Sequence, residues 1–215
     1  MKTVWNILCV SLIGYASIAA AMGDNGHSTS DANIKPELST AAAPKLEWKV
    51  STDPVHRSNI KGVPNFGKLN DEIWRSGQPT REGYELLAKQ GLKTVVNLRE
   101  EFPQDKDLIP DGIHYVYIPI PDEHAPTADQ ARTFLQVASN PDNWPLLVHC
   151  HAGEGRAGVM SALVRRALDK WDNTKTLREV SNFRTSHLLF GSIPMAGEQQ
   201  KFIRAWGDAD RVATN

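Results

Sequence analysis

From about Trp48 onward, the hydrophobic residues of the chain form short apolar runs that alternate with segments of helical spacing. The runs EIWRSGQP, KTVVNLR, IHYVYIPI and PLLVHC are typical of strands. The segments REGYELLAKQ, ADQARTFLQVAS, GVMSALVRRALDKW, TLREVSNFRTSHLL and AGEQQKFIRAW are typical of helices. PLLVHC lacks polar alternation, which indicates a strand at the centre of a sheet. This order predicts an α/β fold with a mainly parallel central sheet flanked by helices.

Capping residues mark the ends of two of these helices. Thr80 and Thr127 are the expected N-caps, and Gly91 ends the first helix. The apolar positions of the second helix share one face and predict its buried side, namely Ala131, Phe134, Leu135 and Ala138.

The first 46 residues have a different character. Lys2 precedes an apolar stretch ending in small residues, which is typical of a signal peptide cut near Ala21 or Met22. An uncleaved membrane anchor is the alternative, because about 19 apolar residues approach spanning length. Lipid attachment at Cys9 is disfavoured by the bulky Leu8 before it. We expect a signal peptide at 1–22, a flexible polar spacer at 23–46, one globular domain at 47–210, and an exported, periplasmic or secreted protein.

Charge and cysteine content narrow the function classes. Lys and Arg together number 24 against 25 Asp and Glu, so the composition gives no electrostatic case for binding nucleic acid. Signal cleavage would remove Cys9 and leave Cys150 as the single cysteine, without an internal disulfide. A lone thiol in an oxidising compartment is expected to be buried or reactive.

The segment LLVHCHAGEGRAGVMSALV places a cysteine and an arginine at the two ends of a glycine-rich loop between a strand and a helix. Backbone amides of such a loop and the positive end of the helix can surround an anion and favour a thiolate at Cys150. The planar guanidinium of Arg156 matches two oxygens of a phosphoryl group. The pattern predicts a phosphoryl-transfer site with Cys150 as nucleophile. The expected substrate-binding residues are His151, Ala152, Gly153, Glu154, Gly155 and Arg156.

His149, Cys150 and Arg156 match the His-Cys, five residues, Arg motif, and the chain resembles the protein tyrosine and dual-specificity phosphatase superfamily over roughly residues 60–205. IWRSGQP and VVNLREE resemble the early strands of bacterial dual-specificity-like members. The resemblance implies a phosphatase domain at 47–210, a cysteinyl-phosphate intermediate hydrolysed by water, and no metal or other cofactor. It also implies that His149 orients the loop and tunes the thiol. The alternative is a core histidine bonded to backbone.

The resemblance further implies an aspartate that protonates the leaving group, on a loop before the second predicted helix. PIPDEHAPT occupies that place, and we take Asp122 as the acid, with Glu123 and His124 as alternatives. Asp122 could also be an ordinary turn residue after Pro121.

Two residues depart from the pattern of the family. Ala157 stands where a Ser or Thr hydroxyl commonly assists the departure of the cysteine, so we expect a slower second step and an accumulating phosphoenzyme. Glu154 places a negative charge beside the phosphate site, which disfavours highly phosphorylated inositides relative to phosphoproteins or small monoesters.

Other functions of this loop agree less well with the sequence. Rhodanese-type loops are shorter, and arsenate reduction needs resolving cysteines. Joint metal ligation by His149 and His151 is disfavoured, because alternate residues of a strand point to opposite faces. A non-catalytic phosphate-recognising module and an exported, phytase-like inositol-phosphate phosphatase stay open. The expected partner is a phosphorylated substrate, and we expect a monomer without stable membrane association after signal cleavage.

Overall fold

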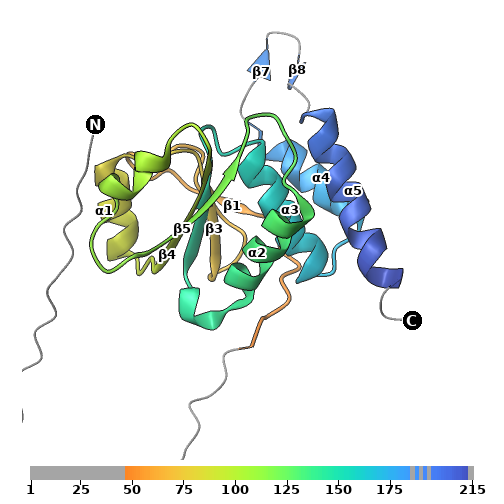
Figure 1. Ribbon diagram of the computed structural model, residues 1–215, viewed down its shortest axis with the longest axis horizontal. Helices are drawn as coiled ribbons and strands as arrows, with labels where there is room; N and C mark the ends of the chain where they lie inside the picture. Colours follow the sequence, from red (N-terminus) through yellow and green to blue (C-terminus); the bar gives the residue numbers. More distant parts are fainter. Residues whose placement is uncertain (1–46, 185–186, 189–190, 193–194, 213–215) are drawn as a thin grey trace, which may run out of the picture. The chain divides into compact units, whose positions relative to one another are not determined.

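The computed structural model describes residues 47–184, 187–188, 191–192 and 195–212. Six strands form one sheet in the order β1-β2-β3-β6-β4-β5 (Figure 1). β3, β6, β4 and β5 run parallel, whereas β1 and β2 pair antiparallel at one edge. The strands span His56–Arg57 (β1), Gly67–Lys68 (β2), Ile73–Ser76 (β3), Thr94–Arg99 (β4), His114–Ile120 (β5) and Leu146–His149 (β6). The predicted α/β fold with a mainly parallel sheet and a central PLLVHC strand is confirmed.

Five α-helices and two 3-10 helices connect or follow the strands in the described part of the chain. Thr80 and Thr127 cap α1 and α2 through their side chains, as predicted, and Gly91 follows α1 with a positive φ of 94°. The helices span Arg81–Lys89 (α1), Pro103–Leu108 (η1), Ala128–Ser139 (α2), Pro141–Asn143 (η2), Arg156–Ala167 (α3), Asn173–Asn182 (α4) and Gly197–Val212 (α5).

The boundaries of two predicted helices were wrong. The helix after the Cys loop begins at Arg156, two residues before the predicted Gly158, and ends at Ala167 rather than at Trp171. The segment predicted as one helix through TLREVSNFRTSHLL is helical only to Asn182, because a second small sheet begins with β7 (His187–Leu188) and continues with β8 (Gly191–Ser192). The apolar HLL run continued the helical pattern and hid this change.

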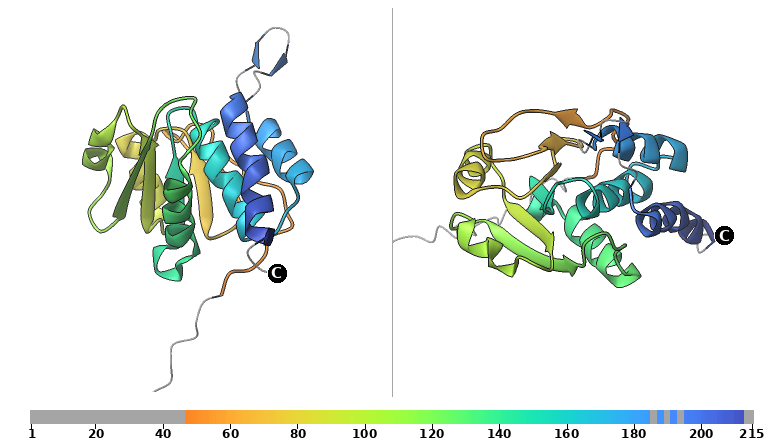
Figure 2. Two further views of the ribbon diagram at one scale, coloured as in Figure 1. Left: turned by 45° about the vertical axis from the view of Figure 1, so that its right-hand side comes forward. Right: turned by 90° about the horizontal axis from the view of Figure 1, so that it is seen from above.

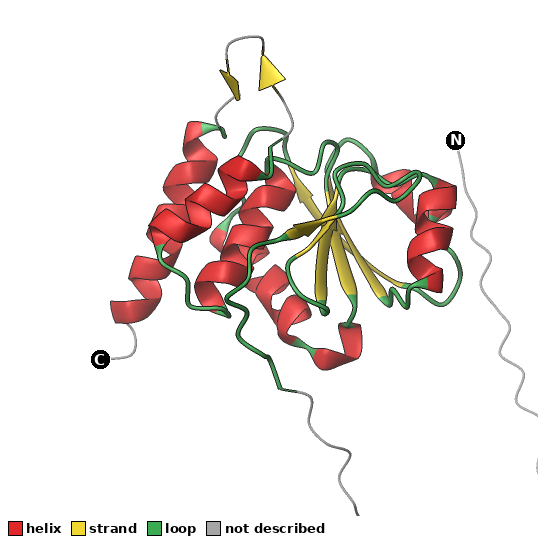
Figure 3. Ribbon diagram, turned by 180° about the vertical axis from the view of Figure 1, so that it is seen from behind, coloured by secondary structure: helices red, strands yellow, loops and turns green. Residues whose placement is uncertain are grey.

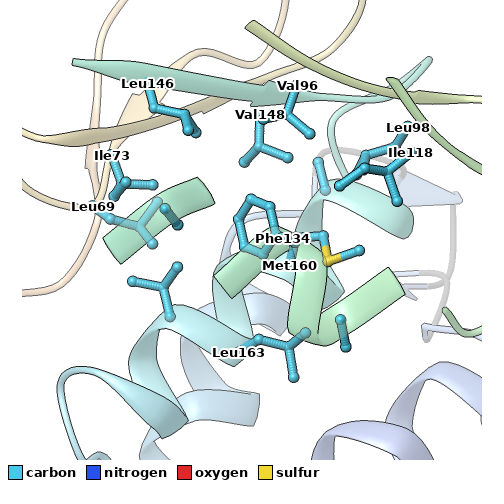
Figure 4. Packing of buried hydrophobic residues seen from close by; sticks show 14 of the residues in the cluster. Leu69, Ile73, Val96, Leu98, Ile118, Phe134, Leu146, Val148, Met160 and Leu163 are labelled. Carbon is cyan, nitrogen blue, oxygen red and sulfur yellow. The ribbon is translucent and has the colours of Figure 1, made fainter. Parts of the chain in front are cut away.

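Both faces of the central sheet are buried. Alternate residues of a strand point to opposite faces, so Val95 and Leu147 pack with Tyr84 of α1, whereas Val96 and Val148 belong to the larger cluster on the other face. Figure 2 shows the sheet between α1 on one side and the remaining α-helices on the other, and Figure 3 shows the same arrangement from behind. Figure 4 shows the larger cluster, formed by Leu69, Ile73, Val96, Leu98, Ile118, Phe134, Leu146, Val148, Met160 and Leu163, among others.

The first 46 residues, for which a signal peptide and a spacer are predicted, are not part of the described structure. The expected signal peptide (1–22) and spacer (23–46) lie outside the described residues. Within the described residues, no helix is long and apolar enough to span a membrane.

Candidate active site

Cys150 lies directly after β6, at the carboxyl end of the central strand, and its loop leads into α3 at Arg156. This is the edge of a parallel sheet at which binding sites form in α/β folds. The residue is 3% exposed, and its Sγ accepts a hydrogen bond from the backbone N–H of Gly153 at 3.2 Å. The loop therefore curls back over the sulfur atom.

The carbonyl groups of this loop are held on its outer side. The backbone N–H of Gln78 donates to the carbonyl of His151 at 2.9 Å, and the side-chain amide of Asn65 donates to that of Ala152 at 3.2 Å. Nη2 of Arg75 donates to the carbonyl of Gly153 at 2.5 Å. In a trans peptide the N–H points opposite to the carbonyl. The N–H groups of residues 152–154 are thereby directed to the inner side of the loop, as the bond from Gly153 to Sγ illustrates.

Gly153 is required for this conformation. Its φ is +76°, in the left-handed region that glycine tolerates best. A Cβ there would lie 2.5 Å from the backbone nitrogen of Gly77. The loop therefore packs backbone to backbone against the segment after β3.

The N-terminus of α3 has no side-chain cap. α1, α2 and α4 each begin with a side chain that accepts a backbone N–H, from Thr80, Thr127 and Asp172 respectively. The N-cap residue of α3 is Gly155, which makes no such bond. The first N–H groups of a helix and its dipole form a site for an anion, and here no side chain of the helix satisfies them.

Arg156 is held by carboxylates from two other loops and is only 1% exposed. Nη1 and Nη2 donate to Oε2 and Oε1 of Glu101 at 2.7 and 3.0 Å, and Nη1 also donates to the carbonyl of Ile120 at 3.1 Å. Oδ1 of Asp122 lies 3.2 Å from Nη2. The buried Nε has no protein partner. One edge of the guanidinium is thus fixed by Glu101, while the edge containing Nε has a donor left for a ligand.

The electrostatics of this group follow from the ion pair. The hydrogen bond from Arg156 lowers the pKa of Glu101 to about 2, against the effect of burial, which would raise it. Burial alone would lower the pKa of Arg156, but Glu101, Cys150 and Asp122 together raise it above its usual value. The arginine stays charged.

His149 belongs to a buried network on the α1 side of the sheet. Its Nε2 lies 2.9 Å from Oδ2 of Asp105 and 3.1 Å from the hydroxyl of Tyr84. Tyr84 donates to Asp105 at 2.7 Å, and the amide of Gln78 donates to the other carboxylate oxygen. On the other side of the ring, Nδ1 lies 3.4 Å from the carbonyl of Cys150. The histidine is therefore a core residue bonded to side chains, adjacent to the thiol.

The pKa values within this network move in opposite directions. Burial and the neighbouring carboxylate raise the pKa of Tyr84. Burial would also raise the pKa of Asp105, but hydrogen bonds from His149, Tyr84 and Gln78 outweigh it and lower that pKa. Asp105 is therefore an ionised acceptor enclosed by donors.

The loop after β5 places the candidate acids differently. Asp122 is exposed (74% for its side chain) and faces Arg156, as its 3.2 Å separation from Nη2 shows. Glu123 has a positive φ of 63°, and Nδ1 of His124 bonds to the carbonyl of Asp122 at 2.8 Å. The amide of Gln199, from α5, donates to the carbonyl of His124 at 3.1 Å. Of the three candidates, Asp122 is the one with a contact to the Cys loop among the described residues.

The remaining predicted residues have distinct environments. His151 and Ala152 are exposed, whereas Glu154 is 4% exposed and lies 3.7 Å from Nη2 of Arg184. The side chain of Glu154 is therefore covered by its neighbours rather than solvated. Ala157 is buried in the first turn of α3.

Four residues of the site were not predicted from the sequence. Glu101, Asp105, Tyr84 and Gln199 come from four elements other than the Cys loop, so no local spacing reveals them. A sequence signal existed for Glu101 alone, because it ends VVNLREE, which the resemblance to the family had already singled out.

The chain matches a known family of phosphatases over most of its length. A family model described as DSP-PTPase phosphatase fused to NAD+ kinase matches residues 50–203, more than half of the chain. Probable tyrosine-protein phosphatase DG1060 of Dictyostelium discoideum is 31% identical over 164 residues, which cover 70% of this chain and 90% of that protein. NAD kinase 2, chloroplastic, of Arabidopsis thaliana is 35% identical over 116 residues, which cover 50% of this chain. The matched region is only 12% of that kinase.

Solved structures share the fold. The core catalytic domain of the PP-IP phosphatase Siw14 from S. cerevisiae superposes with a TM-score of 0.57 at 27% identity, covering 70% of this chain and 92% of that domain. P. aeruginosa TpbA gives a TM-score of 0.59 at 22% identity, covering 76% and 97%. The likeness to TpbA concerns the fold alone.

Proposed function

The chain belongs to the DSP-PTPase family of cysteine-dependent phosphatases and is a phosphoric monoester hydrolase, and on that premise we propose which residues perform each step. Cys150 is the nucleophile. Arg156 and the inward N–H groups of the loop bind the transferred phosphoryl group, and Asp122 is the general acid.

In the first step the thiolate of Cys150 attacks phosphorus. The S–P bond forms, the bond from phosphorus to the ester oxygen breaks, and its electron pair stays on that oxygen, which takes the proton of Asp122. The non-bridging oxygens accept hydrogen bonds from the inward N–H groups of the loop, from the N-terminus of α3 and from Nε of Arg156. These donors stabilise the charge that develops in the transition state.

In the second step water attacks the cysteinyl phosphate. Asp122, now ionised, accepts a proton from this water, the S–P bond breaks and orthophosphate leaves. The thiolate returns to its place beneath the N–H of Gly153. Ala157 supplies no hydroxyl to assist its departure, so this step is expected to limit the rate.

The observation that carries the proposal is the set of donors without protein acceptors around Cys150. The N-terminus of α3 has no side-chain cap, and Nε of Arg156 is buried without a partner. Buried donors are normally satisfied, so unpaired donors at the end of the Cys150 loop support an anionic ligand there.

The test is the hydrolysis of p-nitrophenyl phosphate by the wild-type chain and by Cys150→Ser, each assayed with and without a metal chelator. We expect turnover by the wild type that is insensitive to the chelator, and no turnover by the variant. Turnover that survives Cys150→Ser, or that needs added metal, would reject the thiol mechanism.

For the substrate class, we propose phosphotyrosine, phosphoserine or phosphothreonine in proteins, or small monoesters, ahead of polyphosphorylated inositides. The argument is Glu154, whose carboxylate lies in the loop itself; its pairing with Arg184 offsets part of that charge. The competing candidate is an inositol-phosphate phosphatase, which is favoured by relatives such as Inositol diphosphatase DSP5 of Arabidopsis thaliana, 30% identical over 123 residues. Rates on phosphopeptides, inositol phosphates and nucleotides, compared between wild type and Glu154→Gln, decide between them.

We also propose export, from the charge and apolar pattern of residues 1–22. Cell fractionation and N-terminal sequencing of the mature chain test this. A mature N-terminus near residue 22 supports it, and an intact N-terminus contradicts it.

A further inference from the structure

Arg75 is a fully buried arginine beneath the Cys loop. It lies on β3, where it pairs with Val148 of β6, and its side chain is among the largest that are completely buried. Its position is two residues after Ile73, on the face of the sheet that packs against α3. A charged side chain in such a place needs an explanation, because lysine and arginine are rarely buried without a charged partner.

The contacts of Arg75 leave much of its hydrogen-bonding capacity unused. Nη2 donates to the carbonyl of Gly153, and the guanidinium lies 4.0 Å from the centre of the Phe183 ring. Nε and Nη1 are buried and have no hydrogen-bond partner. Within the described residues, no carboxylate forms an ion pair with this group.

The charges near Arg75 indicate which negative group offsets its buried positive charge. Burial lowers the pKa of Arg75 to about 10, and the negative charge of Cys150 opposes that lowering more than any other group, ahead of Glu179 and Glu154. A Coulomb interaction is symmetric. The geometry supports this proximity: Gly153, whose carbonyl accepts from Arg75, donates its N–H to Sγ of Cys150 at 3.2 Å.

We propose that Arg75 is a positioning residue for the phosphatase reaction: its buried charge favours the thiolate of Cys150, and its hydrogen bond to Gly153 holds the loop closed around that thiolate. The inference rests on the proposed function of Cys150. Arg75 does not touch the substrate, because the Gly153 carbonyl that it binds faces away from the inner side of the loop.

The test is the rate at which iodoacetamide alkylates Cys150, followed on the Cys150 peptide by mass spectrometry between pH 4 and 9. Alkylation reports the thiolate without requiring turnover, so it separates this inference from the failure of the proposed function. Three variants separate the two roles of the side chain. Arg75→Lys keeps the charge, Arg75→Gln keeps a donor for the Gly153 carbonyl without the charge, and Arg75→Met keeps neither.

The control is Arg57→Met. Arg57 stacks on Phe183 as Arg75 does, 4.3 Å from the ring centre, but it is exposed and donates to the carbonyl of Asn182. Its loss changes the net charge by the same amount. The other charged or titratable groups around Cys150 stay in every variant, namely His149 on β6, Glu154 and Arg156 on the loop, Glu101 after β4 and Asp122 after β5.

We expect Arg75→Met and Arg75→Gln to lower the alkylation rate of Cys150 at pH 6 about tenfold relative to the wild type. Arg75→Lys should retain most of the wild-type profile, and Arg57→Met should match it. Folded Gln and Met variants with the wild-type profile would overturn the inference. So would an equal loss in the Lys and Gln variants, because that pattern indicates packing alone. If Arg75→Met does not fold, the comparison of Lys with Gln still decides.

Discussion

Arg156 donates to both carboxylate oxygens of Glu101, so the guanidinium plane is fixed by a residue 55 positions away in the sequence. Two parallel bonds of this kind define orientation as well as distance. The arginine is therefore held in one orientation, and the edge containing Nε is the one left for a phosphoryl group in the proposed mechanism.

Loss of this alignment is expected to weaken catalysis. Glu101→Gln removes the charge and one acceptor, and we predict a fall in kcat/KM of about 10–100-fold, the range for a charged hydrogen bond. Glu100→Gln, at the exposed neighbouring position, is the matched control and should stay near wild type. Equal kinetics for Glu101→Gln and wild type would contradict the prediction.

The same ion pair predicts a pH range. The folded-state pKa of Glu101 is about 2, below that of the unfolded chain, so the pair is intact at neutral pH and is lost only as the pH falls through about 2. Orientation of Arg156 should therefore not contribute to any acid limb between pH 4 and 6. A pH profile of kcat/KM for Glu101→Gln with the same acid limb as the wild type, at a lower level, is the expected result. Disappearance of that limb in the variant would show that Glu101 titrates within this range.

The general acid can be identified through the leaving group. Asp122→Asn should lower kcat/KM, which reports the first step, about 10²–10⁴-fold on phenyl phosphate, whose leaving oxygen needs a proton. The loss should be much smaller on p-nitrophenyl phosphate, because p-nitrophenolate leaves without protonation. Glu123→Gln is the comparison, and a larger leaving-group effect there than in Asp122→Asn would transfer the role to Glu123.

Ala157 makes the second step testable. The wild type should show a burst of p-nitrophenol followed by slow turnover, with phosphoenzyme trapped by rapid acid quench. Ala157→Ser should raise the steady-state rate severalfold and reduce the trapped fraction, because its hydroxyl can assist the departing sulfur. Ser161→Ala is the control, since it removes a hydroxyl one turn further along α3. Absence of a burst, with no gain in Ala157→Ser, would count against slow dephosphorylation.

The network around Asp105 should contribute to stability. Asp105→Ala leaves the donors of Tyr84 and Gln78 buried without an acceptor, which we expect to reduce the free energy of unfolding by about 2–4 kcal/mol at pH 7. Asp107→Ala, an exposed aspartate in the same 3-10 helix, should have little effect. Urea unfolding measures both.

The pH dependence of this effect has a defined sign. The pKa of Asp105 is lowered by folding, so its stabilising contribution is full above the unfolded value of about 4 and is lost as the pH falls through the folded-state value. The difference between wild type and Asp105→Asn should therefore shrink below about pH 4. A difference that grows on acidification would contradict the lowered pKa.

Much of this fold was predictable because its signals are local. Hydrophobic period and capping residues identified the four parallel strands and the N-caps Thr80 and Thr127 without knowledge of the tertiary structure. The two-residue strands β1 and β2 are too short to show a period, and the end of α4 was concealed by continuing apolar residues.

The site divides in the same way. Cys150 and Arg156 occur in one loop, so their spacing was visible in the sequence. The residues that hold this loop meet it only because the topology brings β3, β4 and the 3-10 helix beside β6. Glu101 holds it through Arg156, Asp105 through His149, and Arg75 through Gly153. Their roles follow from the hydrogen-bond donors that have no partner in the folded chain, such as Nε of Arg156. Such donors cannot be recognised in any single segment of the sequence.

The uncapped N-terminus of α3 should make the enzyme sensitive to the concentration of orthophosphate. If the inward N–H groups of the Cys150 loop and the N-terminus of α3 bind the phosphoryl part of an ester, they also bind free orthophosphate, the product of every cycle. Environments rich in phosphate should occupy part of the enzyme and slow it, whereas phosphate scarcity should release it. We therefore expect added orthophosphate to slow hydrolysis by the wild-type chain.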